Sequence, residues 1–494
     1  MDILLGLDLG TTNIKALAIG SDGHPVAGVS APTPESNGEY DAEALWGVSA
    51  RLIREVGEKI PGEHHVAALA VASMGEAGVL LDADGQPLAP IIPWYDKRTL
   101  AALDWWRAHI SEADLYRITG LSLRHIYSAC KLLWYCDNAP QSFSRALTWL
   151  CLADWITFRL TGVRSMSYSI ACRTMLFDVR QRAWSAELLC LTNLPARLFP
   201  SVFPSGQVVG AVTRDAAYAT GLREGTPIVV GGHDHICAAL AAGVVEPGRV
   251  LDSSGTVEAI MVPLTQPVLD PARTGGMSCG CHTMRDRYYL IGGMMSGGVV
   301  DWLGRMLGGN DSPQSIARLM EEAAASPLGA NGLWFEPYLD GAASRPRDPE
   351  AWGAWLGLRL HHTRADLLRA AMEGLSFGIR YLSEGIQQAT QSPIHELRAV
   401  GGGTRNAWWQ QLKADVLGVP IETPAVSDVT AQGAALLAGI GIGLFANEAD
   451  AIACAYRPAI RYHVDDEKHA RYNAAYRAYC ALYPALKTVS LKAG

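Results

Sequence analysis

The stretch 3-ILLGLDLGTTNIKALAI-19 opens the chain and decides its fold. Its apolar residues form two runs, separated by Gly10, Thr11 and Thr12. This pattern predicts two β-strands joined by a tight glycine-containing turn. Glycine lets the backbone approach a phosphate closely, while threonine hydroxyls and turn amides can donate hydrogen bonds to its oxygens. The stretch therefore predicts a phosphate-binding hairpin, and an ordinary hairpin turn remains the alternative.

A second hairpin of the same kind is expected after Gly243. Residues Arg249 to Leu251 lead into a polar turn that ends at Gly255 and Thr256, and an apolar run follows from Val257 to Val262. A similar unit used twice, about 245 residues apart, indicates two homologous halves. We therefore expect two large domains, 1–245 and 246–494.

An acidic residue follows a buried strand near the end of the first half. Asp234 stands in the sequence GGHDH, 231–235, after an apolar strand and before the helical run Ile236 to Ala242. A carboxylate at the carboxyl end of such a strand is well placed to take a proton from a substrate hydroxyl. The alternative is that Asp234 only caps the helix that follows.

A glycine-rich turn follows the predicted strand Leu397 to Val400. Gly401, Gly402 and Gly403 open a helix that continues beyond Asn406. Without side chains, these positions leave room for a flat ring or a phosphate to lie on the backbone. The turn predicts a nucleotide site, and a strand-to-helix turn without a ligand is the alternative.

Several further elements can be read from the pattern of apolar residues. A long amphipathic helix is expected through Leu368, Leu375 and Ile386, and Thr363 with Asp366 gives it a start resembling a capping box. Buried strands are expected at 66–73 and 227–232, and helices at 100–109 and 131–137.

The composition favours a globular protein that acts on a small molecule. Of 494 residues, 49% are hydrophobic and 18% charged, and the formal net charge of -8 gives no basic surface for nucleic acid or an anionic membrane. No apolar stretch is long enough to span a membrane, and no signal peptide can be read at the start. The ten cysteines are scattered, as in proteins kept reduced, so a cytoplasmic location is expected.

Taken together and in order along the chain, these motifs resemble the FGGY carbohydrate kinases of the sugar kinase, actin and Hsp70 superfamily. The similarity continues through Trp94, through Lys131 to Trp134, and through the segment from Gly353 to Glu373. The resemblance implies an α/β fold of two actin-like, ribonuclease H-like domains on either side of a deep cleft. It also implies ATP and Mg²⁺ as cofactors and a sugar or polyol as substrate, with the amino-terminal domain holding the sugar and the carboxy-terminal domain the nucleotide.

The same resemblance implies a role for each matching residue. Asp234 would be the general base and Asp8 the metal-associated carboxylate. The residues assigned to ATP are Gly10, Thr11, Thr12, Lys15, Gly255, Thr256, Gly402, Gly403 and Asn406. The residues assigned to the substrate are Glu76, Trp94, Asp234 and His235.

The residues expected to contact the substrate, which we call the substrate wall, differ from those of the xylulokinases that the chain otherwise resembles. Glu76 takes the place of a histidine, His235 that of an asparagine and Ile170 that of an aspartate, while Arg173 replaces a small residue. A ketopentose, a tetrose, a pentitol or a deoxy sugar would each suit this polar wall. Glu76 should accept hydrogen bonds from substrate hydroxyls and disfavour an anionic substrate, unless it is an exposed loop residue.

Two other classes of protein share the superfamily. A chaperone or actin-like assembly protein would need a peptide-binding domain or a polymer surface, and a sugar-sensing regulator would need a DNA-binding arm or a missing base. The chain has neither a basic helical arm nor length to spare for a peptide-binding domain. The sequence leaves open the sugar, the phosphorylated hydroxyl, the metal preference and the oligomeric state, for which a homodimer is one expectation.

Overall fold

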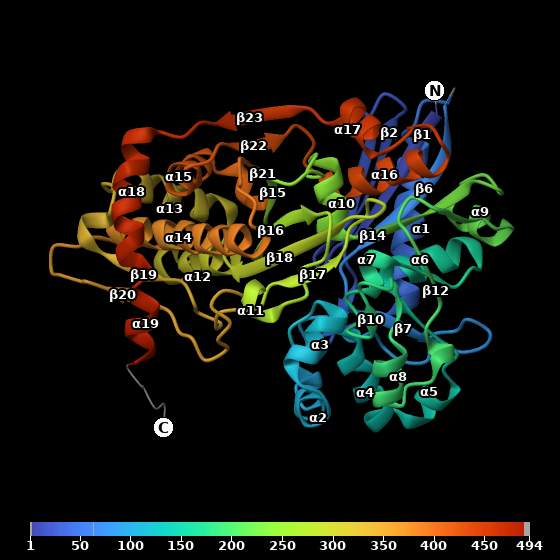
Figure 1. Ribbon diagram of the computed structural model, residues 1–494. Helices are drawn as coiled ribbons and strands as arrows, with labels where there is room; N and C mark the ends of the chain where they lie inside the picture. Colours follow the sequence, from blue (N-terminus) through green and yellow to red (C-terminus); the bar gives the residue numbers. More distant parts are fainter. Residues whose placement is uncertain (1, 63, 489–494) are drawn as a thin grey trace.

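The computed structural model describes residues 2–62 and 64–488, which form two lobes built around one β-sheet each (Figure 1). The first sheet has the order β13-β14-β6-β1-β2-β3 and the second the order β17-β18-β16-β15-β21-β22-β23. The strands of the first sheet are β1 (Asp2–Leu9), β2 (Asn13–Gly20), β3 (Pro25–Pro32), β6 (His65–Ser73), β13 (Val208–Ala211) and β14 (Pro227–His233). Those of the second are β15 (Arg249–Ser254), β16 (Val257–Leu264), β17 (Ser278–Cys281), β18 (Tyr288–Met295), β21 (Glu396–Gly401), β22 (Ile421–Pro424) and β23 (Pro458–Tyr462).

Helices and short strand pairs complete the two lobes. The helices up to residue 241 are α1 (Ala42–Glu58), α2 (Ala102–His109), α3 (Glu112–Thr119), α4 (Ser128–Asn138), α5 (Pro140–Arg145), α6 (Leu152–Thr161), α7 (Tyr168–Ala171), α8 (Ala186–Thr192), α9 (Arg214–Thr220) and α10 (Asp234–Ala241). The later helices are α11 (Pro271–Thr274), α12 (Gly297–Gly308), α13 (Pro313–Ala325), α14 (Arg364–Thr390), α15 (Ala407–Leu417), α16 (Val429–Gly441), α17 (Glu448–Ala455), α18 (Asp466–Tyr479) and α19 (Leu482–Lys487). The short strands are β4 (Glu35–Ser36), β5 (Glu39–Tyr40), β7 (Gly78–Leu81), β8 (Thr148–Cys151), β9 (Ser165–Ser167), β10 (Phe177–Asp178), β11 (Ala183–Trp184), β12 (Ser201–Phe203), β19 (Trp334–Glu336) and β20 (Ala354–Leu356).

The two sheets share one strand arrangement, which confirms the two predicted hairpins. In the first sheet β1 pairs antiparallel with β2 and parallel with β6. In the second, β15 pairs antiparallel with β16 and parallel with β21 in the same way. The predicted strands, the helices near 100–109 and 131–137 and the long helix α14 are also confirmed, and the backbone N–H of Thr363 donates to Asp366 Oδ2 at 2.8 Å where α14 begins.

The first sheet is covered by helices on both faces, so its central strand β1 is buried almost throughout. Ile3 and Leu5 point toward α1 and α6, whereas Leu4 belongs to the core that includes α16. Gly6 lets α16 approach closely, because a Cβ at this position would lie 1.8 Å from the carbonyl oxygen of Ala431. Helix α16 thus completes the first lobe although it comes from the second half of the chain, and the division at residue 245 stays a prediction.

Helices α10 and α16 cross at backbone contact between the lobes. A Cβ at Gly433 of α16 would lie 1.9 Å from the carbonyl oxygen of Cys237 in α10, so only glycine allows this approach.

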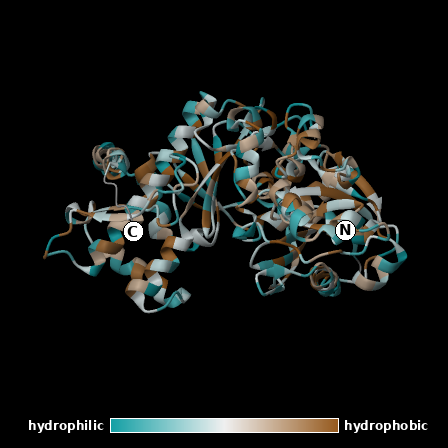
Figure 2. Ribbon diagram, turned by 90° about the horizontal axis from the view of Figure 1, so that it is seen from below, coloured by the Kyte–Doolittle hydropathy of each residue, from teal (hydrophilic) through white to brown (hydrophobic). Residues whose placement is uncertain are grey.

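Hydrophobic residues follow the strands of both sheets, as Figure 2 shows. Among residues 2–62 and 64–488, no helix is both long and apolar enough to cross a bilayer.

A buried cluster of charges joins the second sheet to α15. The Nζ atom of Lys413 donates to Asp252 Oδ2 at 2.9 Å, to Ser254 Oγ at 3.0 Å and to Glu258, and the charged side chains have no solvent exposure. Burial works against the charge of Lys413, but the two carboxylates raise its pKa above the usual value. The cluster therefore ties the turn after β15 to the helix that follows the glycine-rich motif.

Replacing Lys413 by methionine should lower the free energy of unfolding by roughly 3 to 5 kcal/mol, because it leaves buried carboxylates without a cation. Urea denaturation of Lys413→Met and of the exposed control Lys468→Met would measure this, with about 1 kcal/mol or less expected for the control. A loss below about 1 kcal/mol in Lys413→Met would show that the cluster contributes little.

A buried carboxyl on β19 should make stability depend on pH. Burial raises the pKa of Glu336 to about 7, although the hydroxyl of Tyr479 donates to it. Because the folded state binds this proton more tightly than the unfolded state, stability that is present below about pH 4.5 is lost as the pH rises through about 7. In Glu336→Gln the fall in unfolding free energy between pH 5 and pH 8 should be smaller by about 1 to 3 kcal/mol. Equal falls in wild type and variant, measured by urea titration, would contradict this assignment.

Candidate active site

The predicted catalytic segments meet because three parallel strands of the first sheet end side by side. In the strand register Leu9 of β1 lies opposite Ser73 of β6, and Ser73 lies opposite His233 of β14. The segments that follow these strands begin at Gly10, Met74 and Asp234, so the sheet brings all three to one edge. Ligands of α/β proteins bind at this carboxyl edge.

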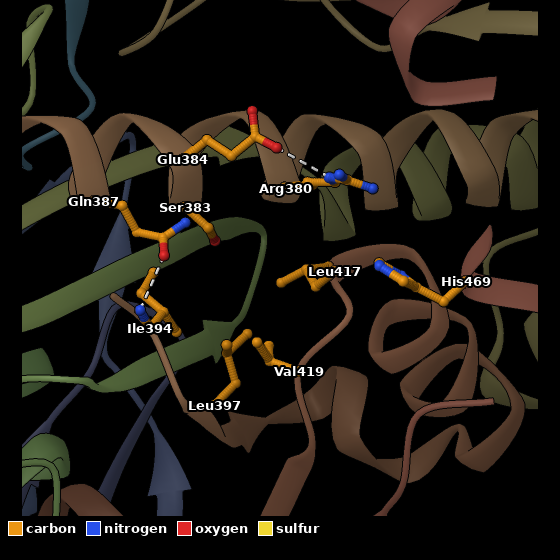
Figure 3. Close-up of a pocket in the computed structure, with 9 residues that line it drawn as sticks. All are labelled: Arg380, Ser383, Glu384, Gln387, Ile394, Leu397, Leu417, Val419 and His469. Atoms are coloured by element: carbon orange, nitrogen blue, oxygen red, sulfur yellow. Dashed lines mark hydrogen bonds and ion pairs between the residues drawn. The ribbon is translucent and has the colours of Figure 1, made fainter. Parts of the chain in front are cut away.

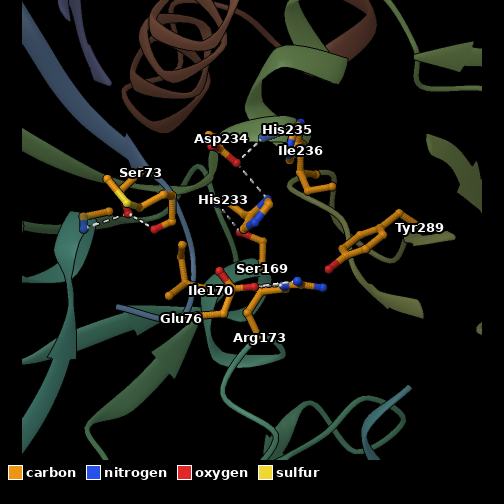
Figure 4. A network of polar contacts seen from close by, with 12 residues as sticks. Ser73, Glu76, Ser169, Ile170, Arg173, His233, Asp234, His235, Ile236 and Tyr289 are labelled. Carbon is orange, nitrogen blue, oxygen red and sulfur yellow. Dashed lines mark hydrogen bonds and ion pairs between the residues drawn. The ribbon is translucent and has the colours of Figure 1, made fainter. Parts of the chain in front are cut away.

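Asp234 is the first residue of α10, and its carboxylate is partly exposed. One oxygen, Oδ1, accepts the backbone N–H of His235 at 2.6 Å and lies 3.2 Å from Nδ1 of His233 (Figure 4). Burial lowers the pKa of His233 to about 3, so this imidazole is neutral near pH 7. One carboxylate oxygen is therefore held in place, and the other is left to accept a proton.

Asp8 is buried beside Asp234, and its Oδ1 has no hydrogen-bond partner among the described residues. Burial first, and then the charge of Asp234, raise the pKa of Asp8 to about 8. In the described part of the chain, no three Asp, Glu, His or Cys side chains are grouped closely enough to hold a metal ion. Mg²⁺ commonly uses one or two carboxylates together with water and phosphate oxygens, and an unpartnered carboxylate oxygen fits that mode.

The first hairpin turn, Gly10 to Thr12, is held in shape by hydrogen bonds from residues that lie outside the hairpin. The hydroxyl of Thr33 donates to the carbonyl of Gly10 at 2.7 Å, and its backbone N–H donates to the carbonyl of Thr12 at 2.9 Å. Trp94 Nε1 donates to the hydroxyl of Thr11 at 3.1 Å, so the predicted substrate wall touches the predicted phosphate loop.

The side chain of Lys15, on β2, extends toward α16. Its Nζ atom forms an ion pair with Asp428 Oδ1 at 2.8 Å, and Asp428 is the N-cap residue of that helix. Sequence reasoning did not identify Asp428. Its residue type and position before a helix could have suggested a cap, but nothing local points to Lys15, which is 413 residues away in sequence.

The predicted nucleotide motifs of the second lobe are also adjacent. Ser254, at the end of β15, lies opposite Gly401 in β21, and a Cβ at Gly403 would lie 2.7 Å from the Cβ of Ser254. Gly402 faces open space, with nothing within 4 Å of a Cβ built there. Asn406 caps α15, since its Oδ1 accepts the backbone N–H of Trp409 at 3.0 Å.

A third segment, which sequence reasoning missed, supports the predicted second phosphate turn. The backbone N–H of Gly297 donates to the carbonyl of Gly255 at 3.2 Å, and that of Gly298 donates to the carbonyl of Thr256 at 3.0 Å. These glycines open α12. The glycine-rich run at 292–298 was the signal that could have found them.

The residues predicted to contact the substrate include an ion pair that the sequence did not reveal. Glu76 is only 5% exposed, so the alternative that it is an exposed loop residue is wrong. Arg173 Nε and Nη2 both donate to Glu76 Oε1, at 2.8 and 2.5 Å. His235 places its ring near His233, with the ring centroids 5.5 Å apart. Glu76 and Arg173, two separate departures from the expected sequence, are therefore partners in space.

The hollow in Figure 3 lies elsewhere, on the second lobe beside α14, and contains none of the predicted site residues. Its charged groups already have partners. Arg380 donates to Glu384 Oε1 at 3.1 Å and to the carbonyl of Val416 at 2.9 Å, and Tyr476 donates to Glu384 Oε2 at 2.8 Å. We therefore place the site at the strand ends.

Comparison with known proteins gives a consistent result over nearly the whole chain. The chain is 31% identical to the L-fuculokinase of Escherichia coli K12, covering 90% of this chain and 93% of that protein. It is 28% identical to the xylulose kinase of Bacillus subtilis, covering 99% and 98%. The crystal structure of xylulose kinase from Rhodospirillum rubrum matches with a TM-score of 0.90 and 30% identity, covering 98% of this chain and 99% of that one.

Models of the FGGY family of carbohydrate kinases match both halves. The N-terminal domain of that family matches residues 3–241, and its C-terminal domain matches residues 251–442. The chain therefore belongs to the FGGY family of carbohydrate kinases.

Proposed function

We propose that this protein transfers the γ-phosphate of ATP to a hydroxyl of a sugar or polyol, and that its activity is most like that of a xylulose kinase. The observation that carries the proposal is the position of Asp234, whose partly exposed carboxylate stands at the end of β14 close to Asp8 and the first hairpin. A positioned carboxylate beside a phosphate turn is what transfer to a hydroxyl requires.

In this proposal Asp234 orients the acceptor hydroxyl and removes its proton as the oxygen attacks the γ-phosphorus. The proton goes to the carboxylate oxygen that does not accept the N–H of His235. The turn at Gly10 to Thr12 and the turn at Gly255 and Thr256 donate to the phosphates, with Lys15 beside the first turn. Backbone donors aimed at the transferred group stabilise the charge of the transition state.

The nucleotide lies across the second lobe, with its adenosine on Gly402, Gly403 and Asn406. Asp8 would hold Mg²⁺ through its unpartnered oxygen, and the ion supplies charge neutralisation to the phosphates when bound. The sugar lies against Glu76, Trp94 and His235. ADP release in a coupled assay, measured over a panel of ketoses, aldoses and polyols, tests the function, and no release with any carbohydrate would overturn it.

A cytoplasmic location and a homodimer remain predictions within this proposal. All ten cysteines are unpaired thiols, which suits a reducing compartment. Size-exclusion chromatography with light scattering would measure the oligomeric state.

Asp234→Asn should lower turnover by roughly two to four orders of magnitude, which is the usual contribution of a positioned general base. Because asparagine has nearly the same shape, nucleotide affinity and thermal stability should stay close to wild type. Asp215→Asn, in the exposed first turn of α9, is the matched control. Carbohydrate-dependent ADP release near the wild-type rate in Asp234→Asn would remove Asp234 from this role.

Gly402→Arg should raise the KM for ATP about tenfold or more, equivalent to about 1.4 kcal/mol, and leave the KM for the sugar unchanged. Gly402 suits this test because its side faces open space, whereas any side chain at Gly403 would strike Ser254. Gly47→Arg, at an exposed and equally open position on α1, is the control. An unchanged KM for ATP would place the adenosine elsewhere.

A further inference from the structure

Helix α3 and the loop that follows it bring the first lobe into contact with β17, an edge strand of the second sheet. The backbone N–H of Cys279 in β17 donates to the carbonyl of Gly120 at 2.8 Å. The buried hydroxyl of Tyr116 in α3 donates to the carbonyl of Met277 at 2.7 Å. Only glycine fits at Gly120, where φ is +68° and a Cβ would lie 2.2 Å from the carbonyl oxygen of Cys279. The lobes are therefore in backbone contact along β17.

Arg347 adds a charged contact beside this backbone contact. It belongs to the second lobe, between β19 and β20, and its Nη1 donates to Glu112 Oε1 in the first turn of α3 at 2.5 Å. Its Nη2 donates to the carbonyl of Leu123 at 2.5 Å, and the backbone N–H of Leu123 donates to Glu112 Oε1 at 3.2 Å. One guanidinium thus joins the start of α3 to the loop that follows the helix. We call Arg347, Glu112 and Leu123 the clasp.

The residue after Arg347 anchors the clasp to the second lobe. Asp348 Oδ2 accepts from the hydroxyl of Tyr483 and lies 2.9 Å from Nζ of Lys487, both in α19. The backbone N–H of Asp348 donates to the carbonyl of Ala342 at 3.0 Å, and the return hydrogen bond measures 2.8 Å. Because its backbone is fixed, Arg347 loses less conformational entropy when its side chain is ordered across the lobes.

The loop held by the clasp continues to residues that support the substrate wall. Ser128, five residues after Leu123, opens α4 and has no exposed surface. Its hydroxyl donates to the carbonyl of Glu76 at 2.9 Å. The 120–128 segment therefore connects the clasp to the loop after β6, and a shift of this segment would move Glu76.

We propose that Arg347 is a positioning residue for the carbohydrate substrate. It reaches from the second lobe to hold the 120–128 segment of the first, and so keeps the loop that carries Glu76 in place. Arg347 itself contacts neither ATP nor the reacting atoms in this assignment, so its loss should weaken sugar binding and leave the chemical step intact. The inference rests on the proposed carbohydrate kinase function.

The clasp is suited to mutation because it contributes little to folding. The side chains of Arg347 and Glu112 are 30% and 48% exposed, and ion pairs with this exposure add little to stability. Variants at these two positions should therefore fold and keep a melting temperature close to wild type.

The test is a double-mutant cycle of Arg347→Gln and Glu112→Gln, measured as kcat and the KM values for the best sugar and for ATP. Arg347→Gln should raise the sugar KM about three- to tenfold, while kcat and the KM for ATP change less than about twofold. The double variant should resemble Arg347→Gln, because the contact between the two residues is lost only once. Arg347→Lys, which keeps the charge but lacks the fork that reaches Glu112 and Leu123 together, should give an intermediate sugar KM.

Hydrogen exchange gives a second measurement that does not depend on turnover. In Arg347→Gln, backbone amides of the 120–128 segment and of the loop 74–77 should exchange faster than in wild type. Unchanged exchange in both segments would show that Arg347 does not hold them.

Arg182→Gln is the matched control, because Arg182 also pairs across the lobes, with Asp286 Oδ1 at 2.5 Å. Its guanidinium lies over the ring of Tyr288 and not on the 120–128 segment, so the sugar KM of this variant should stay within about twofold of wild type. Equal increases in Arg182→Gln and Arg347→Gln would overturn the inference, since any ion pair between the lobes would then have the same effect.

A sugar KM in folded Arg347→Gln that matches wild type would also overturn the inference, as would independent effects of the two substitutions in the double variant. Both results leave the kinase function intact, whereas a wild type without turnover on any carbohydrate would overturn that function. If Arg347→Gln does not fold, Glu112→Gln, which keeps the contact between Arg347 and Leu123, decides the question by the same sugar KM.

Discussion

The whole arrangement depends on the crossing of α10 and α16 at backbone contact. Gly433 lies against the carbonyl of Cys237, and Gly6 admits α16 to the first sheet. Because the helices touch without intervening side chains, their amino termini are placed close to the same strand ends. One terminus carries Asp234 and the other carries Asp428, and both carboxylates act electrostatically on Asp8. Helix amino termini favour anions, so the crossing positions both the proposed base and a region suited to phosphates.

A buried charge cluster and a buried ion pair fix the remaining parts of the proposed site. In the second lobe Lys413 joins the turn after β15 to α15, so the proposed phosphate and adenosine positions cannot shift independently. In the first lobe Arg173 joins the loop after β6 to the segment after α7. Replacing a whole buried ion pair by apolar side chains often changes stability little, whereas removing one partner is costly, so such groups act mainly by fixing the geometry around them. Their common effect is to hold loops, which are usually the most mobile parts of a fold.

Local sequence was enough to predict both hairpins, the start of α14 at Thr363 and the strand-to-helix turns at Asp234 and Gly402, because each depends on neighbouring residues. Contacts between distant residues could not be read in this way. Lys413 is 155 residues from Glu258, and Arg173 is 97 residues from Glu76. Glu76 and Arg173 each stood out as unusual, but glutamate is ordinarily exposed, and only the fold shows that the two are paired. The packing of α16 on the first sheet likewise has no local signal.

The placement of α16 has a consequence for biosynthesis. The first sheet is complete once β14 has been made, yet the helix that covers one of its faces ends at Gly441, about 200 residues later. At roughly 5 to 20 residues per second, a ribosome needs about 10 to 40 s to produce that segment. During this interval the nascent first lobe presents an uncovered apolar face, so its final collapse must wait for the second lobe and the face is open to chaperones.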